Sequence, residues 1–125
     1  MARVGYLEGT DPVLLSMLAA EGVETLPVSN TFDGHGKPIN YLTKGEVNVV
    51  VGYLHKVVPN EQARTSMFDL MLDNMLVACK AYNIPVVLVA PSGLQEKARK
   101  LLGESRKNVY VVAPNELEAQ IRKYL

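Results

Sequence analysis

The chain has 125 residues, of which 48% are hydrophobic and 21% are charged, as expected for one globular domain spanning residues 1–125. Thirteen basic residues balance thirteen acidic residues, so no overall positive charge attracts nucleic acid, and a nucleic-acid partner is not expected. Cys79 is the only cysteine, which excludes an intramolecular disulfide framework and a multi-cysteine zinc site.

The sequence shows no signal for secretion or membrane insertion. No apolar run approaches the roughly 20 residues of a membrane-spanning helix, and the amino-terminal residues do not form a signal peptide. A single free thiol fits a reducing compartment. We therefore expect a cytoplasmic protein without a membrane partner.

The first residues predict a strand, a helix and a second strand. Residues 4–7 form a short apolar strand, and Asp11 before Pro12 is typical of a helix start. Gly22 ends the predicted helix, and residues 23–28 give the next strand. Two strands joined in this way form a βαβ unit with a right-handed crossover.

The middle of the chain is irregular and then strongly apolar. Residues 29–46 contain several glycines and a proline, so they predict a long connection with at most a short helix near residues 39–44. The β-branched run Val47–Val51 predicts a strand buried on both faces, with a bend at Gly52.

Residues 66–82 predict a long helix that is apolar around nearly its whole circumference. One side would pack on the sheet, and the other would meet a second helix or a second copy of the chain. Residues 85–90 predict another buried strand.

Two further helices and one strand complete the pattern. A capping box, Ser92-Gly93-Leu94-Gln95, opens a helix whose core face is expected to contain Leu94, Ala98, Leu101 and Leu102. Residues 109–112 give the fifth strand. The last helix is expected to be capped by Asn115 with Glu118, and to bury Leu117, Ile121 and Tyr124.

Five strands alternating with helices predict an α/β fold with a doubly wound parallel sheet. We expect a flavodoxin-like or Rossmann-like three-layer sandwich with strand order 2-1-3-4-5. Ligands of such sheets bind outside the carboxyl ends of the strands, where the strand order reverses. That edge would be lined by residues 8–11 and 52–56, with residues 29–37 and 91–93 beside them.

The candidate catalytic residues are His55, His35 and Asp33. A histidine can act as a general base near neutral pH, and the neighbouring Lys56 could hold an anion. A loop histidine beside a solvated lysine explains the same pair. The stretch from Asp33 to Lys37 is either a flexible loop carrying functional groups or a sharp surface turn.

The candidate ligand-binding residues come from the same strand ends. Ser92 and Gly93 could hold a phosphate at a helix amino terminus, although helix capping accounts for them equally well. No residue spacing indicates a metal site, and no motif identifies a cofactor. The full ligand-binding set is Glu8, Thr10, Asp11, Ser29, Asn30, Lys37, Lys56, Ser92 and Gly93.

The stretch Glu8-Gly9-Thr10-Asp11, between an apolar strand and a helix, resembles the opening of toprim domains. In that family the glutamate holds magnesium together with an Asp-x-Asp pair after a later strand. This chain has no aspartate at positions 52–56, so two-metal chemistry lacks ligands there. The alternative interpretation is a helix cap beside a solvent-exposed glutamate.

The sequence is consistent with three alternative functions. The first is binding of a small anionic ligand, such as a nucleotide-like molecule, at the carboxyl edge of the sheet, by a transferase or hydrolase. The strand–helix–strand arrangement that ends at Ile84–Val87 is loosely similar to nucleoside deoxyribosyltransferases. The second is a non-catalytic regulatory or scaffold domain, a homo-oligomer that dimerises through the helix at residues 66–82. The third is a degenerate toprim-like nucleic-acid protein.

Overall fold

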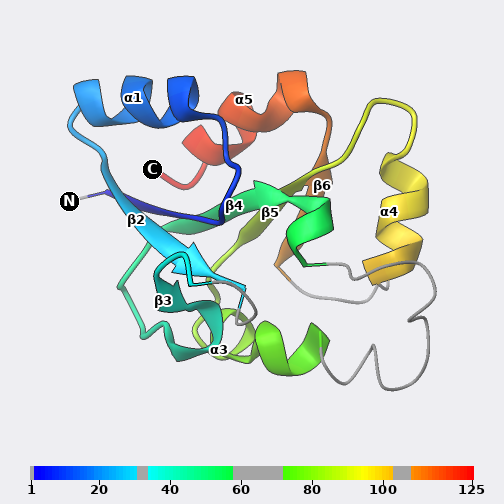
Figure 1. Cartoon of the computed structure of the whole chain (residues 1–125), viewed down its shortest axis with the longest axis horizontal. Coiled ribbons are helices and arrows are strands. Elements are labelled where there is room, and N and C mark those ends of the chain that lie inside the picture. Colours follow the sequence, from blue (N-terminus) through cyan, green and yellow to red (C-terminus); the bar gives the residue numbers. More distant parts are fainter. Residues whose placement is uncertain (1, 31–33, 58–71, 103–107) are drawn as a thin grey trace.

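The computed structural model describes residues 2–30, 34–57, 72–102 and 108–125. A parallel sheet with helices on both faces forms its centre (Figure 1). The sheet has six strands in the order β3-β2-β1-β4-β5-β6, and every neighbouring pair is parallel. The strands are β1 (Arg3–Tyr6), β2 (Glu24–Ser29), β3 (Lys37–Pro38), β4 (Val49–Tyr53), β5 (Val86–Val89) and β6 (Val109–Val112).

The predicted α/β class with a parallel sheet is confirmed, but the predicted count of five strands is wrong. A sixth strand, β3, lies beyond β2, so the complete order differs from the predicted 2-1-3-4-5. The five longer strands keep the neighbours expected for them. β3 has only two residues, one of them a proline. Proline is unfavourable inside a sheet, so the sequence of this stretch predicts a loop.

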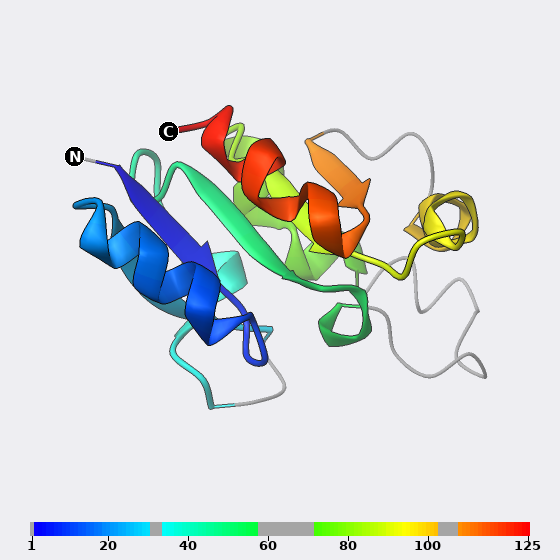
Figure 2. The same ribbon diagram turned by 90° about the horizontal axis from the view of Figure 1, so that it is seen from above.

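The described helices are α1 (Pro12–Ala20), α3 (Val77–Ala81), α4 (Gln95–Leu102) and α5 (Leu117–Arg122). Short 3₁₀ turns lie at η1 (Ile39–Tyr41), η2 (Leu54–Lys56) and η4 (Pro114–Glu116). Figure 2 shows α1 and α5 on the same face of the sheet. No helix within the described ranges is long and apolar enough to cross a bilayer.

Two hydrophobic cores sandwich the sheet. On one face, Leu18 of α1 and Ile121 of α5 pack against Val49 and Val51 of β4. On the other face, Val50 belongs to a core with Cys79 of α3 and with Ala98 and Leu102 of α4. Alternate residues of β4 thus enter opposite cores, as the period of two in a strand requires. The prediction that this strand is buried on both faces is confirmed.

The strand predicted at residues 47–51 is shifted to Val49–Tyr53, and the bend predicted at Gly52 is wrong. Gly52 lies inside β4, where an added Cβ would be 2.6 Å from Leu7 Cδ1. The Leu7 amide donates a 2.9 Å hydrogen bond to the Val51 carbonyl. The glycine therefore makes room for the residue that follows β1, and the turn comes two residues later, at η2.

Several helix details differ from the predictions. Asp11 caps α1 as expected, and Ala98 and Leu102 are buried, but Leu94 is exposed. The last helix is not capped by Asn115: the Glu116 carboxylate accepts a 2.9 Å hydrogen bond from the Ala113 amide, and α5 begins at Leu117. This bond lies before α5, and the residue at the N-cap of α5, Glu116, makes no side-chain capping bond to the helix.

The long helix predicted at residues 66–82 is described only from residue 72 onward. A helical turn at residues 72–75 leads into α3, with an interruption at Leu76. Leu72, Met75 and Cys79 are buried, whereas Val77 is exposed. The described part therefore has one buried side and one open side, and its predicted role as a dimer interface stays a prediction.

Candidate functional site

The strand order reverses between β1 and β4. From β1 the chain passes to β2 and β3 on one side, and then returns to β4 on the other side of β1. Such a reversal leaves the connections diverging at the carboxyl ends of the two central strands, where ligands of open α/β sheets bind. Glu8 follows β1 here, and His55 and Lys56 follow β4 in the turn η2.

Glu8 and Lys56 meet across this reversal point. The Lys56 Nζ atom lies 3.7 Å from Glu8 Oε2, with side-chain exposures of 22% and 51%. A charge-assisted hydrogen bond is about 2.7–2.9 Å long, so these two groups are neighbours with a loose contact. Gly9 has a φ of +85°, and a Cβ there would be 3.7 Å from Lys56 Cε, so the lysine stem passes close to this turn.

Asn30 holds the backbone from which Lys56 projects. Its side-chain Nδ2 donates a 2.8 Å hydrogen bond to the Lys56 carbonyl. Asn30 directly follows the last residue of β2, so this bond links the carboxyl ends of β2 and β4 across β1. The predicted ligand-binding residue Asn30 thus positions the turn that carries Lys56.

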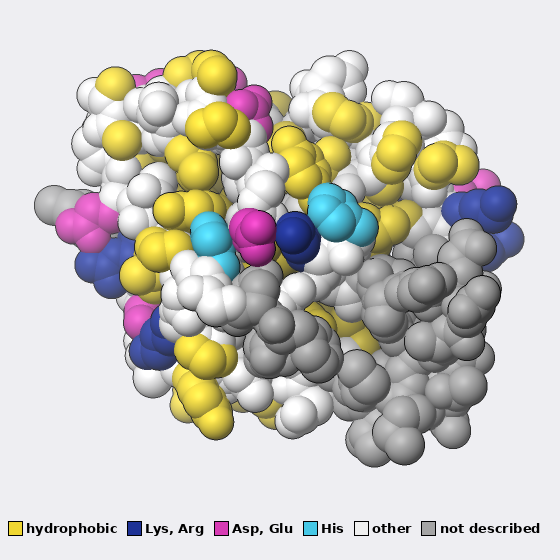
Figure 3. All heavy atoms as spheres, viewed as in Figure 1, with side chains coloured by type: hydrophobic (Ala, Val, Ile, Leu, Met, Phe, Trp, Pro, Cys, Tyr) yellow, Lys and Arg dark blue, Asp and Glu magenta, His cyan; other side chains and the backbone are white. Residues whose placement is uncertain are grey.

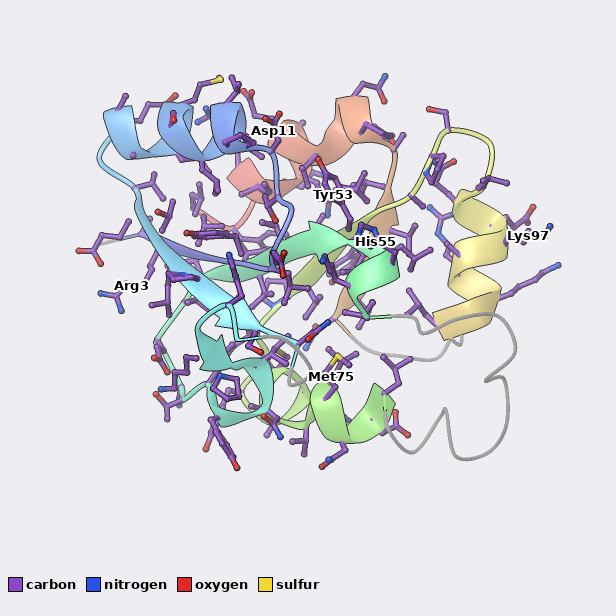
Figure 4. All side chains as sticks on the ribbon, in the orientation of Figure 1. Arg3, Asp11, Tyr53, His55, Met75 and Lys97 are labelled. Atoms are coloured by element: carbon purple, nitrogen blue, oxygen red, sulfur yellow. The ribbon has the colours of Figure 1, made fainter. Side chains whose placement is uncertain are left out.

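Both histidines lie near this point, each against a tyrosine. His55 is exposed and stacks on Tyr53 with a centroid distance of 6.1 Å and an interplanar angle of 19°; Figure 4 labels both rings. His35 meets Tyr6 edge to face at 5.3 Å, and its Nδ1 lies 3.3 Å from the Val28 carbonyl. In Figure 3 the two histidine side chains flank one acidic and one basic side chain in a row.

We call Glu8, His35, His55 and Lys56 the switch-point cluster. A close backbone approach fixes the residue after His35, because any Cβ at Gly36 would collide with the Pro27 carbonyl. The 3₁₀ turn η2 provides the change of direction that lets the adjacent residues His55 and Lys56 serve one region. A placed ammonium, a carboxylate and two imidazoles can bind an anion and exchange protons with it.

Other predicted site residues have structural contacts. The Thr10 hydroxyl is buried and donates a 2.7 Å hydrogen bond to the Leu7 carbonyl. The Asp11 carboxylate accepts a 2.9 Å hydrogen bond from the Val13 amide and caps α1. Ser29 is buried as the last residue of β2. Asp33 lies outside the described residues.

Lys37 is engaged by Glu46, a partner that the sequence did not reveal. Its Nζ atom lies 2.9 Å from both carboxylate oxygens of Glu46. Glu46 also accepts hydrogen bonds from the Thr43 amide and hydroxyl. The hydrogen bond from Lys37 is the main reason why the pKa of Glu46 is lowered. This pair fastens the segment between β3 and β4.

Ser92 and Gly93 lie exposed in the turn before α4. The Gly93 amide donates a 3.2 Å hydrogen bond to the Gln95 side chain, and Gln95 Nε2 donates in turn to the carbonyls of Ala90 and Pro91. The expected phosphate-binding amide of Gly93 is therefore already engaged within the turn.

Neither a reactive thiol nor a metal cluster is found in the part of the chain that the structure describes. Burial raises the pKa of Cys79 to about 12, so its thiol stays protonated near neutral pH. Within the same ranges, no three histidine, cysteine or acidic side chains come together to hold a metal ion.

Comparison with known proteins leaves the family open. No family model matches the chain, and no curated protein matches it. One solved structure that is similar is described as "Structure of MT0777"; it has 14% sequence identity and a TM-score of 0.45, covering 98% of this chain and 95% of that chain. A likeness at this level says nothing about the function of the chain.

Proposed function

We propose that this chain is a flavodoxin-like or Rossmann-like protein that binds a small anionic ligand at the switch-point cluster. The observation that carries the proposal is the loose Lys56–Glu8 contact across the point where the strand order reverses. Lys56 supplies the positive charge, and the bond from Asn30 to its carbonyl fixes the turn in advance. A preorganised ammonium loses less freedom when an anion binds.

The aromatic rings support a nucleotide-like ligand within this class. Tyr53 and His55 stack nearly parallel, and the exposed His55 ring has a face that a planar group could cover. His55 is also next to Lys56 in the chain, so it is the group best placed to exchange a proton with a bound anion. This is the basis for proposing a transferase or hydrolase.

Thermal shift assays test the binding proposal directly. Nucleotides, sugar phosphates, inorganic phosphate and divalent metals should be screened, since a ligand at 100 times its Kd stabilises the folded state by about 2.7 kcal/mol. We expect anions to raise the Tm of the wild type and to lose this effect in Lys56→Met. Lys97→Met, on the exposed side of α4 (Figure 4), is the matched control. Equal shifts in both variants would place the anion site elsewhere.

His55→Ala tests the enzymatic part. Any transfer or hydrolysis of a ligand that binds should fall by about 10²–10⁴-fold in this variant, while the ligand still raises the Tm. Unchanged turnover in the variant would remove His55 from the chemistry and leave Lys56 as a binding residue only.

The second candidate function is a dimeric regulatory or scaffold protein. Val77 and Tyr82 are exposed at α3, and Tyr41 is exposed on η1, which packs against α3. Large apolar side chains exposed on two adjoining elements favour a protein contact there. We expect light scattering to give the mass of two chains, and Val77→Glu to give one. A wild-type mass of one chain at micromolar concentration would contradict this candidate.

The toprim-like alternative has less support. Glu8 is next to Lys56, Asp11 is engaged as a helix cap, and positions 52–56 carry no aspartate. A magnesium ion would therefore meet one carboxylate and a competing ammonium group. A nuclease or topoisomerase assay with magnesium should show no activity.

A further inference from the structure

Glu8 is an acceptor with spare capacity. Half of its side chain is exposed, and within the described ranges its one ionic neighbour is Lys56, at 3.7 Å. An ionised carboxylate can accept about four hydrogen bonds. The oxygens of Glu8 are therefore open to donors from outside the protein.

The Lys37–Glu46 pair is an example in this chain of a carboxylate that is fully engaged with a lysine. There, both oxygens lie 2.9 Å from the ammonium, and Thr43 adds two further donors. Glu8 has none of this closure. The contact with Lys56 alone therefore does not explain why a carboxylate is at position 8. A carboxylate here also repels a simple anion that approaches the lysine.

We propose that Glu8 determines the specificity of the site by accepting a hydrogen bond from a hydroxyl group of the ligand, while Lys56 binds the anionic group of the same molecule. The ligand class is thus a hydroxylated anion, such as a sugar phosphate or the ribose phosphate part of a nucleotide. This inference rests on the proposed function.

The spacing fits such a ligand. An anionic oxygen about 2.8 Å from Nζ and a hydroxyl oxygen about 2.7 Å from the carboxylate can lie no more than about 9 Å apart, given the 3.7 Å between the two protein atoms. A phosphate oxygen and a hydroxyl on one of the next carbons of the same small molecule lie within this limit. The hydroxyl compensates for the repulsion that the carboxylate exerts on the phosphate.

Two ligands that differ only in their hydroxyl groups test the inference: glycerol 3-phosphate and propyl phosphate. Calorimetry is done at about pH 8, where both phosphates are dianions. We expect wild type to bind glycerol 3-phosphate about tenfold more tightly. In Glu8→Gln, binding of glycerol 3-phosphate should weaken about fivefold, whereas binding of propyl phosphate should tighten about twofold, because the repulsion is gone.

Lys56→Met should lose both ligands, and Glu96→Gln, on the exposed side of α4, should bind both as wild type does. If Glu8→Gln tightens both ligands by the same factor, Glu8 is only a repelling counter-charge and the inference fails while the proposed function stands. If Lys56→Met binds both ligands normally, the proposed function fails and the inference fails with it. If wild type binds neither phosphate, the inference fails, whereas the proposed function is decided by the anion screen. Because the Glu8 side chain is half exposed, Glu8→Gln should fold, and its melting curve should show a Tm close to that of wild type.

Discussion

Two lysine–glutamate pairs in this molecule have the same residue types but different geometry. Lys37 and Glu46 meet at 2.9 Å, and only 18% of the Glu46 side chain is exposed. Lys56 and Glu8 lie 3.7 Å apart, and 51% of the Glu8 side chain is exposed. The first pair is closed, with each group satisfied by the other. The second leaves charge and hydrogen-bonding capacity at the edge where a ligand is expected. Geometry, and not composition, separates the closed pair from the pair that we propose binds a ligand.

The largest expected effect comes from the packing that brings Glu8 beside Lys56. Gly52→Val places a side chain where even a Cβ is 2.6 Å from Leu7, the residue before Glu8. We expect a loss of about 3 kcal/mol in urea unfolding, together with weaker anion binding, because Leu7 must move.

Gly34→Ala is the control for this substitution, since a Cβ there meets nothing within 4 Å. A Gly52→Val protein as stable as Gly34→Ala would show that β1 and β4 tolerate separation, and that the Lys56–Glu8 distance is not fixed by the strands.

The closed pair should matter for stability. Glu46→Gln removes a charge-assisted bond to Lys37 and weakens the bonds from Thr43. We expect a loss of about 1–2 kcal/mol in the free energy of unfolding, measured in urea near neutral pH. Glu24→Gln, in an exposed pair with Arg3, is the control and should change stability by less than about 0.5 kcal/mol. Equal effects of the two substitutions would contradict the distinction between a closed pair and a surface pair.

Acid should weaken the closed pair. The pKa of Glu46 is lowered from its ordinary value of 4.5, chiefly by the hydrogen bond from Lys37. The unfolded chain therefore takes up the proton at a higher pH than the folded chain does, and the stabilisation present above that value is lost as the pH falls through the folded pKa. The stability difference between wild type and Glu46→Gln should shrink from about pH 7 to about pH 3. A constant difference would show that charge plays no part in it.

The smallest effect is expected for the loose pair. Glu8→Gln should leave the free energy of unfolding within about 0.5 kcal/mol of wild type, because an exposed pair at 3.7 Å contributes little. The same substitution is expected to change ligand affinity severalfold. A loss of stability as large as that of Glu46→Gln would make Glu8 a structural residue.

The sequence predicted the long buried strands because continuous apolar runs are typical of strands that are buried on both faces. Val49–Val51 and Val86–Val89 are buried between two cores, where an unpaired polar side chain would be costly. Their neighbours followed from the alternation of strands and helices, and this placed Glu8 and Lys56 at one edge. The sequence did not reveal β3, whose two residues carry neither alternation nor an apolar run.

Contacts made by loops were not predictable from spacing. Glu46 reaches Lys37 because η1 and the residues after it fold the chain back, and no local pattern marks that return. His55 stacks on Tyr53 because a 3₁₀ turn follows β4, whereas the sequence suggested a bend at Gly52. In both cases tertiary packing, and not local preference, selects the backbone conformation.

The proline in β3 limits what can attach to that edge of the sheet. β3 is the outermost strand, it has two residues, and Pro38 has no amide hydrogen to donate to a further strand. A strand from another molecule would find few backbone partners along Lys37 and Pro38, so edge-to-edge growth into larger sheets is disfavoured on this side. Replacing Pro38 by valine would restore a backbone donor and make the protein more prone to aggregate through this edge.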